Sequence, residues 1–278
     1  MQLNDTTHEG GIEIIHPDID LGHIRHALFD FDGTISLIRE GWQEIMEGMM
    51  VELLLETPEH ESQEAIACIV KEFITELTGK QTIYQMIRLN EEIEARGGQA
   101  ADPLAYKEKY HARLLDRIQN RLNGLESKQI DPEEMVVPGS LEMLERLQER
   151  GIVCYLASGT DETYVVNEAN LLGVTSYFKA VYGAQDDYQN FSKRKVIQRI
   201  IQENDLKGPE LVAFGDGYVE IEDTKGVGGI AVGVATNEDT KTGINEWKRA
   251  RLMRAGADII IPDFRQYAAL LKTLFPEE

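Results

Sequence analysis

Hydrophobic residues recur along this chain in two patterns, one typical of strands and one of helices. Several short apolar runs are rich in β-branched and aromatic residues, and each ends in small or acidic residues. Helical patterns separate most of these runs, which is typical of βαβ units and a parallel sheet. Ile12–Ile15 predicts a further, short edge strand. The main predicted strands are His26–Asp32, Ile152–Ser158, Lys179–Ala184, Leu211–Asp216, Ile230–Ala235 and Asp258–Asp263.

The segments between these strands carry apolar residues at helical spacing. Ser140–Arg150 is one such helix, and we expect Ser140 as its N-cap and Gly151 as its C-cap. Asp161–Leu172 and Lys195–Glu203 have the same pattern. Strands that alternate with helices predict a Rossmann-like α/β core around a parallel sheet.

Between Ile35 and Val137 the alternation of strands and helices stops, and only helical patterns remain. The methionines of the first helix would suit a cofactor groove, but core packing is the better interpretation. We therefore expect an all-helical domain at 36–136, inserted into an α/β core made of 1–35 and 137–278. The predicted helices cover Trp42–Leu54, Ile66–Leu77, Ile83–Ala95 and a segment from Asp102, as N-cap, to about Leu122.

Composition narrows the possible functions. The 278 residues are 42% hydrophobic and 28% charged, which is typical of a globular protein, and the net charge is −21. So much negative charge argues against nucleic-acid and membrane partners, and it requires local cations or a metal ion if the substrate is anionic. The two cysteines, Cys68 and Cys154, are far apart. Together with a polar start of the chain, they favour a cytoplasmic protein.

Candidate chemistry begins at the end of the first strand, in Asp30-Phe31-Asp32-Gly33-Thr34. Alternation places the two carboxylates on one side, where their repulsion favours a divalent cation. One carboxylate can attack phosphorus while the other transfers a proton. A turn with an acidic cap is the competing interpretation of these residues.

Three further segments support the catalytic interpretation. Ser158-Gly159 ends the second strand, where a hydroxyl and a close backbone suit a phosphate oxygen. Lys193 lies near a helix start, where a cation is unfavourable unless it faces an anion, and Lys195 is an alternative to it. Asp216 ends the fourth predicted strand and Glu220 lies four residues later, and such oxygen ligands suit Mg²⁺.

These segments, in this order, resemble the four motifs of the haloacid dehalogenase (HAD) superfamily. The resemblance covers about residues 24–34 and 136–275, and it implies a HAD-like core in which the inserted helices form a C1 cap domain. It also implies an enzyme that transfers phosphate, because haloalkanoic-acid dehalogenases lack the second aspartate, here Asp32.

Carried over, the resemblance implies a role for each motif residue. Asp30 would be the nucleophile that becomes aspartyl-phosphate, and Asp32 the general acid and base. Ser158 and Lys193 would bind the phosphoryl oxygens. The Mg²⁺ ligands would be Asp30, Asp216 and the backbone carbonyl of Asp32, with Glu220 either reaching the metal through water or supporting Lys193. We expect further substrate contacts from Thr34, Gly159, Arg39 and Lys80, although hinge or surface roles explain Arg39 and Lys80 equally well.

The leading functional hypothesis is a Mg²⁺-dependent phosphatase that hydrolyses a small phosphomonoester, a sugar phosphate or a nucleotide. The alternative is a phosphomutase of the β-phosphoglucomutase type, which would need the same core residues. A second alternative is a binding protein that has kept the fold and lost activity. The expected partner is a small phosphorylated metabolite, with no nucleic acid and no membrane, and the protein would be a monomer or a homodimer.

Overall fold

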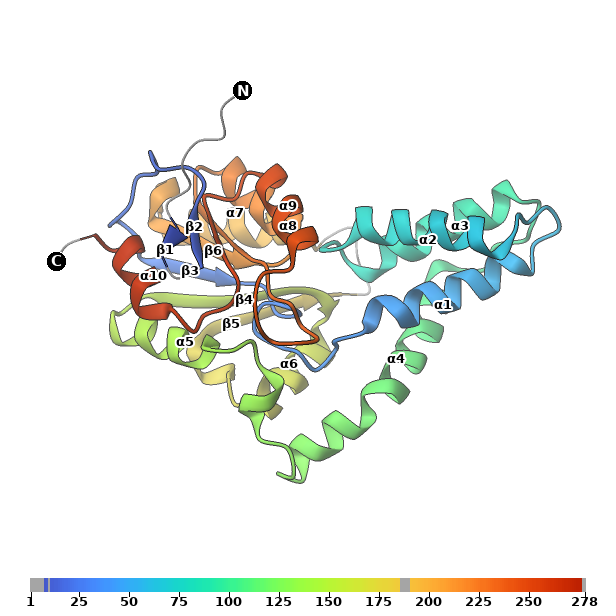
Figure 1. Cartoon of the computed structure of the whole chain (residues 1–278), viewed down its shortest axis with the longest axis horizontal. Coiled ribbons are helices and arrows are strands. Elements are labelled where there is room, and N and C mark those ends of the chain that lie inside the picture. Colours follow the sequence, from blue (N-terminus) through green and yellow to red (C-terminus); the bar gives the residue numbers. More distant parts are fainter. Residues whose placement is uncertain (1–7, 10, 186–190, 277–278) are drawn as a thin grey trace.

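An eight-stranded sheet forms the centre of the chain in the computed structural model, which describes residues 8–9, 11–185 and 191–276 (Figure 1). The strand order is β1-β2-β8-β7-β6-β3-β4-β5. Neighbours from β8 to β5 are parallel, whereas β1 and β2 are antiparallel additions at one end. The predicted parallel sheet is confirmed. The strands are β1 His8–Glu9, β2 Ile12–Ile14, β3 His26–Phe29, β4 Val153–Asp161, β5 Phe178–Ala184, β6 Leu211–Gly215, β7 Ile230–Val234 and β8 Ile259–Ile261.

The chain enters the parallel part of the sheet at its middle. After β3 it builds β4 and β5 on one side, and it then returns to β6 and β7 on the other side of β3. The carboxyl ends of β3, β4 and β6 therefore lie side by side where the direction of winding reverses. Ligands bind at such a reversal in open α/β sheets.

Helices cover both faces of the sheet because residues in β3 alternate between the two faces. Ala27 and Phe29 pack with α5, α6 and α10, whereas Leu28 packs with α7 on the opposite face. A third cluster joins α8 and α9 to β7 and β8 on the face that α7 covers (Figure 1). These helices are α5 Ser140–Glu149, α6 Glu162–Leu171, α7 Lys193–Glu203, α8 Tyr218–Gly226, α9 Glu246–Ala255 and α10 Tyr267–Leu274.

Four helices, here called the helical insertion, lie between β3 and α5 in sequence and extend away from the sheet (Figure 1). The two chain segments that lead to and from the insertion run beside each other. Leu37 N donates to Met135 O at 2.8 Å, and Val137 N donates to Ile35 O at 2.9 Å. The predicted domain boundaries fall at this pairing and stay predictions. The helices are α1 Trp42–Leu55, α2 Gln63–Leu77, α3 Thr82–Ala95 and α4 Pro103–Glu126.

Helix starts differ most from the sequence expectations. Asp102 caps α4 as predicted, but the N-cap of α5 is Gly139 and not Ser140. Gly139 has φ +80°, and a Cβ there would lie 2.3 Å from the Phe264 carbonyl carbon, so the close approach requires glycine. The C-cap of α5 is Arg150, one residue before Gly151.

The ends of the predicted sheet also need correction. The strand predicted at Ile12–Ile15 is β2, but it does not lie at the edge because β1 pairs with its outer side. Among the described residues, no helix is both long enough and apolar enough to cross a membrane.

Candidate active site

Parallel pairing brings the predicted motif residues to one edge of the sheet. Asp30 directly follows β3, and its backbone N–H donates to Phe214 O of β6 at 2.9 Å. Ser158 lies near the carboxyl end of β4, and Asp216 directly follows β6. The three side chains reach one pocket of about 80 Å³, which also has walls from the helical insertion.

Lys193 joins two of the acidic groups at this edge. It is the first residue of α7 and does not precede the helix as predicted, because the Ser192 hydroxyl accepts from Lys195 N and makes Ser192 the N-cap. Its Nζ lies 2.7 Å from Asp30 Oδ1 and 2.9 Å from Glu220 Oε2. Burial disfavours the charged lysine, but the two carboxylates outweigh burial and raise the pKa of Lys193. Lys193 is therefore a buried cation fixed against Asp30.

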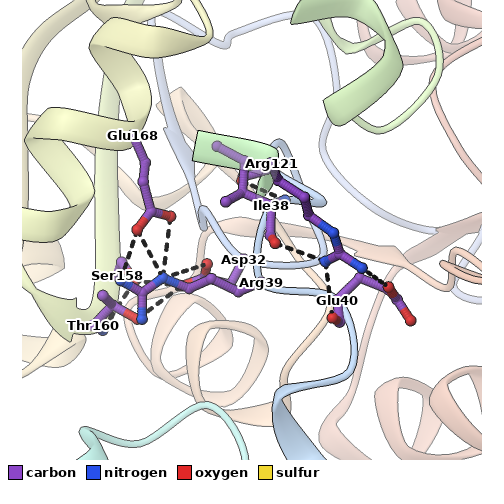
Figure 2. A network of polar contacts seen from close by, with 9 residues as sticks. Asp32, Ile38, Arg39, Glu40, Arg121, Ser158, Thr160 and Glu168 are labelled. Carbon is purple, nitrogen blue, oxygen red and sulfur yellow. Dashed lines mark hydrogen bonds and ion pairs between the residues drawn. The ribbon is translucent and has the colours of Figure 1, made fainter. Parts of the chain in front are cut away.

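Asp32 has a different set of neighbours (Figure 2). Its Oδ2 accepts hydrogen bonds from Ser158 Oγ at 3.2 Å and from Thr160 Oγ1 at 2.9 Å. Its Oδ1 is buried, lies 3.8 Å from Arg39 Nε and has no hydrogen-bond partner among the described residues. Asp32 is thus oriented by two hydroxyl groups, and one of its carboxylate oxygens stays without a hydrogen bond. Thr160 was not among the site residues that the sequence analysis proposed.

Arg39 lines the pocket, but its guanidinium donates its hydrogen bonds to Glu168 of the core. Nε donates to both oxygens of Glu168 at 3.1 Å, and Nη2 donates to Glu168 Oε1 at 2.7 Å (Figure 2). Glu168 belongs to α6, and both side chains are buried. Arg39 belongs to the segment between β3 and α1. In the same segment, the carbonyls of Ile38 and Glu40 accept hydrogen bonds from Arg121 of α4. The segment that leads into the insertion is therefore held by side chains from α4 and α6.

Asp30, Asp216 and Glu220 form an acidic cluster that suits a metal ion. One oxygen of each lies within 4.8 Å of the others. Burial raises the pKa of Asp30 well above its ordinary value, and the charges of Glu220 and Asp216 add to the effect, whereas Lys193 opposes it. A divalent cation would relieve this repulsion, and buried carboxylate oxygens are the ligands that Mg²⁺ prefers. The residues present therefore fit Mg²⁺.

Glu220 is less available to a metal than the other two acids. Its Oε2 accepts from Lys193, and its Oε1 accepts from Gly217 N at 2.7 Å. Both oxygens thus have hydrogen-bond donors already. Among the described residues, Asp30 forms an ion pair through Oδ1 and Asp216 forms one through Oδ2, so each carboxylate has a second oxygen for a metal ion.

Lys248 and Glu238 are functional candidates that the sequence analysis missed. Lys248 of α9 places Nζ 2.7 Å from Asp216 Oδ2 and 2.5 Å from Glu238 Oε1, and it lines the pocket. The lysine is 6% exposed. The sequence did contain an indication of their position. Glu238 and Lys248 follow β7, whose carboxyl end lies at the same edge of the sheet as the other motifs.

The loop between α2 and α3 closes one side of the pocket. A Cβ on Gly159 would lie 2.8 Å from the carbonyl oxygen of Lys80, so this glycine permits close contact between β4 and the insertion. Gly159 and Lys80, two of the residues expected to contact a substrate, both line the pocket. Thr34 is not among its lining residues: it is fully buried, and its hydroxyl has no hydrogen-bond partner among the described residues. The structure therefore does not place Thr34 where it would contact a substrate.

Solved structures share this fold at low sequence identity. A predicted phosphoglycolate phosphatase from Haemophilus somnus 129pt is 14% identical, with a TM-score of 0.59 over 89% of this chain and 98% of that one. A β-phosphoglucomutase from Clostridium difficile is 14% identical, with a TM-score of 0.53 over 83% and 98%. CbbY from Rhodobacter sphaeroides, in complex with xylulose-(1,5)bisphosphate, is 17% identical, with a TM-score of 0.54 over 87% and 95%.

Comparison of the sequence with known proteins gives two results. Curated proteins show no significant match. The family model for haloacid dehalogenase-like hydrolases matches residues 24–226, a segment that begins just before β3 and ends with α8. This match spans most of the chain and contains Asp30, Ser158, Lys193 and Asp216. The chain therefore belongs to the haloacid dehalogenase-like hydrolase family.

Proposed function

We propose that this hydrolase is a Mg²⁺-dependent phosphatase that cleaves a small phosphomonoester through an aspartyl-phosphate on Asp30. The observation that carries the proposal is the contrast between two neighbouring aspartates. Asp30 faces a buried ammonium and a second carboxylate, Asp216, whereas Asp32 faces two hydroxyl groups. The first arrangement suits a nucleophile in an electrostatic phosphate site, and the second suits a proton carrier.

In the first half of the reaction, a carboxylate oxygen of Asp30 attacks phosphorus. The bond between phosphorus and the leaving oxygen breaks, and the proton of Asp32 passes to that oxygen, so the alcohol leaves neutral. Lys193 and the Ser158 hydroxyl offset the charge on the phosphoryl oxygens. Mg²⁺, held by Asp30, Asp216 and the backbone carbonyl of Asp32, would neutralise further phosphoryl charge when bound.

In the second half, Asp32 has lost its proton and takes one from water. The water oxygen bonds to phosphorus, the bond between phosphorus and Asp30 breaks, and inorganic phosphate forms. Glu220 contributes by holding Lys193 in place, which its hydrogen bonds to Lys193 and Gly217 support. We assign it this positioning role and not direct metal binding.

Local cations would bring an anionic substrate to a protein of net charge −21. Arg39, Lys193 and Lys248 line the pocket, but each pairs with at least one carboxylate. Lys80, from the loop between α2 and α3, is exposed, and no ion pair with another described residue is found for it. We propose that Lys80 attracts the substrate or neutralises a second anionic group on it.

We propose that the helical insertion, residues 36–136, acts as a cap on a core formed by 1–35 and 137–278. Support comes from the pocket, whose walls include the Lys80 loop and the first turns of α1. A cap of this kind selects small substrates and excludes bulk water during catalysis. A cytoplasmic location and a monomeric or homodimeric state stay predictions.

A screen of phosphate release tests the proposed function. The full-length protein, with Mg²⁺, would be assayed on sugar phosphates, nucleotides and p-nitrophenyl phosphate, beside Asp30→Asn and a sample treated with chelator. We expect release from at least one substrate by the wild type alone. Equal background rates for all three samples on every substrate would contradict the proposal. Isomerisation of a sugar phosphate without net phosphate release would indicate a phosphomutase instead.

A further inference from the structure

The N-terminal part of the sheet contacts α9, the helix that carries Lys248. β2 pairs with β8 in the antiparallel direction, with Glu13 opposite Ile260. Ile12 belongs to the cluster that packs with α5 and α10, so alternation turns Glu13 to the opposite face, which α9 covers. Glu13 is 5% exposed. Both β2 and α9 lie outside residues 24–226, so their contact belongs to a part of the chain that the family match does not describe.

Glu13 and Arg249 form the ion pair that joins these two elements. Arg249 Nε donates to the two carboxylate oxygens of Glu13 at 2.9 Å and 2.8 Å, and its Nη2 lies 2.7 Å from Glu13 Oε2. A guanidinium that reaches both oxygens of a carboxylate is fixed in direction as well as in distance. Removing one partner would leave the other charge without compensation at a buried position, which is unfavourable. The pair therefore holds α9 against β2 in a defined position.

The first turn of α9 depends on polar contacts of this kind. Three of the ten residues of the helix are buried, and the two apolar ones, Leu252 and Ala255, lie in its second half. At the start of the helix, the Asn245 side chain accepts from two backbone N–H groups of the first turn, at 3.1 Å each. The position of the first turn is therefore set by this cap and by the pair between Glu13 and Arg249.

Lys248 directly precedes Arg249 in that first turn. Successive side chains on a helix point about 100° apart, so Lys248 can point toward the edge of the sheet while Arg249 points toward β2. Lys248 Nζ lies 2.7 Å from Asp216 Oδ2, on one of the carboxylates that would hold Mg²⁺. An ammonium this close to a metal ligand repels a cation at the same site. The strength of that repulsion depends on how firmly the first turn of α9 is held.

We propose that Glu13, through Arg249, positions Lys248 against Asp216 and thereby lowers the affinity of the active site for Mg²⁺. Glu13 is a positioning residue in this account, because it contacts neither the metal site nor the pocket. Lys248 neutralises Asp216 until a metal ion displaces it. The inference rests on the Mg²⁺ site of the proposed function, and it deepens that function by naming a control of the site from the far side of α9.

Calorimetric titration of the full-length protein with Mg²⁺, without substrate, tests the proposal. Glu13→Leu removes the carboxylate that holds Arg249 and still fills the buried space beside α9. We expect the Kd for Mg²⁺ to fall about threefold in Glu13→Leu and about tenfold or more in Lys248→Met, since the ammonium is loosened in the first variant and removed in the second. Glu92→Gln is the control, because Glu92 is also buried and pairs with an arginine, Arg96, at 2.6 Å, but within the helical insertion. Its Kd should equal that of the wild type.

A double variant distinguishes positioning of Lys248 from a general effect on the fold. In the Lys248→Met background, Glu13→Leu should leave the Kd unchanged, because the ammonium that Glu13 positions is gone. Equal falls in the two backgrounds overturn the proposal, as does an unchanged Kd in Glu13→Leu or in Lys248→Met. Arg249→Met breaks the same ion pair from the other side and takes the place of Glu13→Leu if that variant does not fold.

Because Mg²⁺ binding needs no turnover, this test and the test of the proposed function can fail separately. If no substrate releases phosphate but Glu13→Leu still tightens Mg²⁺ binding, the phosphatase proposal fails and the role of Glu13 is supported. If the wild type releases phosphate but the titration detects no Mg²⁺ binding in any of these proteins, the role of Glu13 is overturned and the phosphatase proposal is not.

Discussion

Asp30 and Asp32 are two residues apart, yet their carboxylates have different kinds of hydrogen-bond partner. An ammonium such as Lys193 only donates, so it favours a charged Asp30. The hydroxyls of Ser158 and Thr160 can donate to a carboxylate and can also accept from a carboxylic acid. Asp32 therefore keeps its hydrogen bonds in both protonation states. This property is what a residue that first gives and then takes a proton needs.

Thr160 should affect the proton-transfer steps more than phosphate binding. Thr160→Val keeps the shape of the side chain but removes the hydroxyl that donates to Asp32 at 2.9 Å. We expect kcat/KM for an alkyl phosphate to fall by about tenfold, the effect of losing one hydrogen bond to a charged group. The fall should be smaller for p-nitrophenyl phosphate, whose leaving group needs no proton.

Steady-state kinetics with both substrates measures this difference. Thr175→Val is the matched control, since the Thr175 hydroxyl donates to Asn170 outside the pocket and its loss should change neither rate. Equal losses on the two substrates in Thr160→Val would show that Thr160 does not act through Asp32.

Lys248 should compete with a metal ion for Asp216. Lys248→Met leaves Asp216 and Glu238 without their buried cation. We expect the free energy of unfolding without metal to fall by roughly 3 kcal/mol, as when one partner of a buried ion pair is removed. Mg²⁺ should then raise Tm more in this variant than in the wild type, because a bound cation replaces the lost charge.

Thermal unfolding with and without Mg²⁺ tests the competition. Lys225→Met is the control, because Lys225 pairs with Asp258 at 2.8 Å in another part of the core and its variant should gain no more from Mg²⁺ than the wild type. The role given to Lys248 is wrong if Mg²⁺ raises the Tm of all three proteins by the same amount.

Between elements, α6 links the insertion to the active site. Asp161, which precedes α6, pairs with Lys107 of α4 at 2.5 Å and lies 3.6 Å from His111 of the same helix. Asp161 is the N-cap residue of α6, but its side chain makes no cap hydrogen bond. The ring of His111 also packs edge-on against Tyr164 of α6, with centroids 5.3 Å apart. α4 and α6 thus meet through a buried cluster that contains a titratable histidine.

His111 should make stability depend on pH. Burial lowers the pKa of His111 from 6.5 to about 4, and Arg39 and Lys107 add to the effect while Asp161 opposes it. The unfolded state then binds more protons between these values, so the contribution of His111 is complete above pH 6.5 and is lost as the pH falls toward 4. From about pH 7 to about pH 5 the loss should be roughly 2 kcal/mol.

Denaturant unfolding at several pH values would measure this loss. The free energy of unfolding of the wild type should fall more steeply than that of His111→Gln. His60→Gln, at an exposed histidine, should keep the wild-type slope. Parallel curves for the wild type and His111→Gln would rule out this histidine as the source.

For the whole molecule, what the sequence predicts depends on how far apart the interacting residues are. The strand ends were predictable because apolar runs define strands and parallel strands share one edge. That edge brings Asp30, Ser158 and Asp216 together without further information. No comparable rule predicts the contact between Arg39 and Glu168, which are 129 residues apart in the sequence. That contact depends on how the segment between β3 and α1 packs against α6.

Lys248 was missed because it reaches the site from α9, a helix that lies well beyond the end of β7 and that the hydrophobic pattern did not predict. Its position after β7 indicated the edge of the sheet but not which side chains it would contact there. The net charge of −21 predicted that an anionic substrate would need local cations, but it did not indicate which residues supply them. Four cationic side chains line the pocket.

The most direct test of the account is to trap the phosphorylated enzyme. Asp32→Asn would be mixed with p-nitrophenyl phosphate and Mg²⁺, quenched in acid within one turnover and analysed by intact mass and peptide mapping. The activated leaving group needs no acid, whereas hydrolysis of the intermediate needs the base that this variant lacks, so the phosphoenzyme should accumulate. The account predicts one added phosphoryl group on the peptide that contains Asp30, and none when Asp30→Asn is added. Phosphate release without any adduct, or an adduct on another residue, would contradict it.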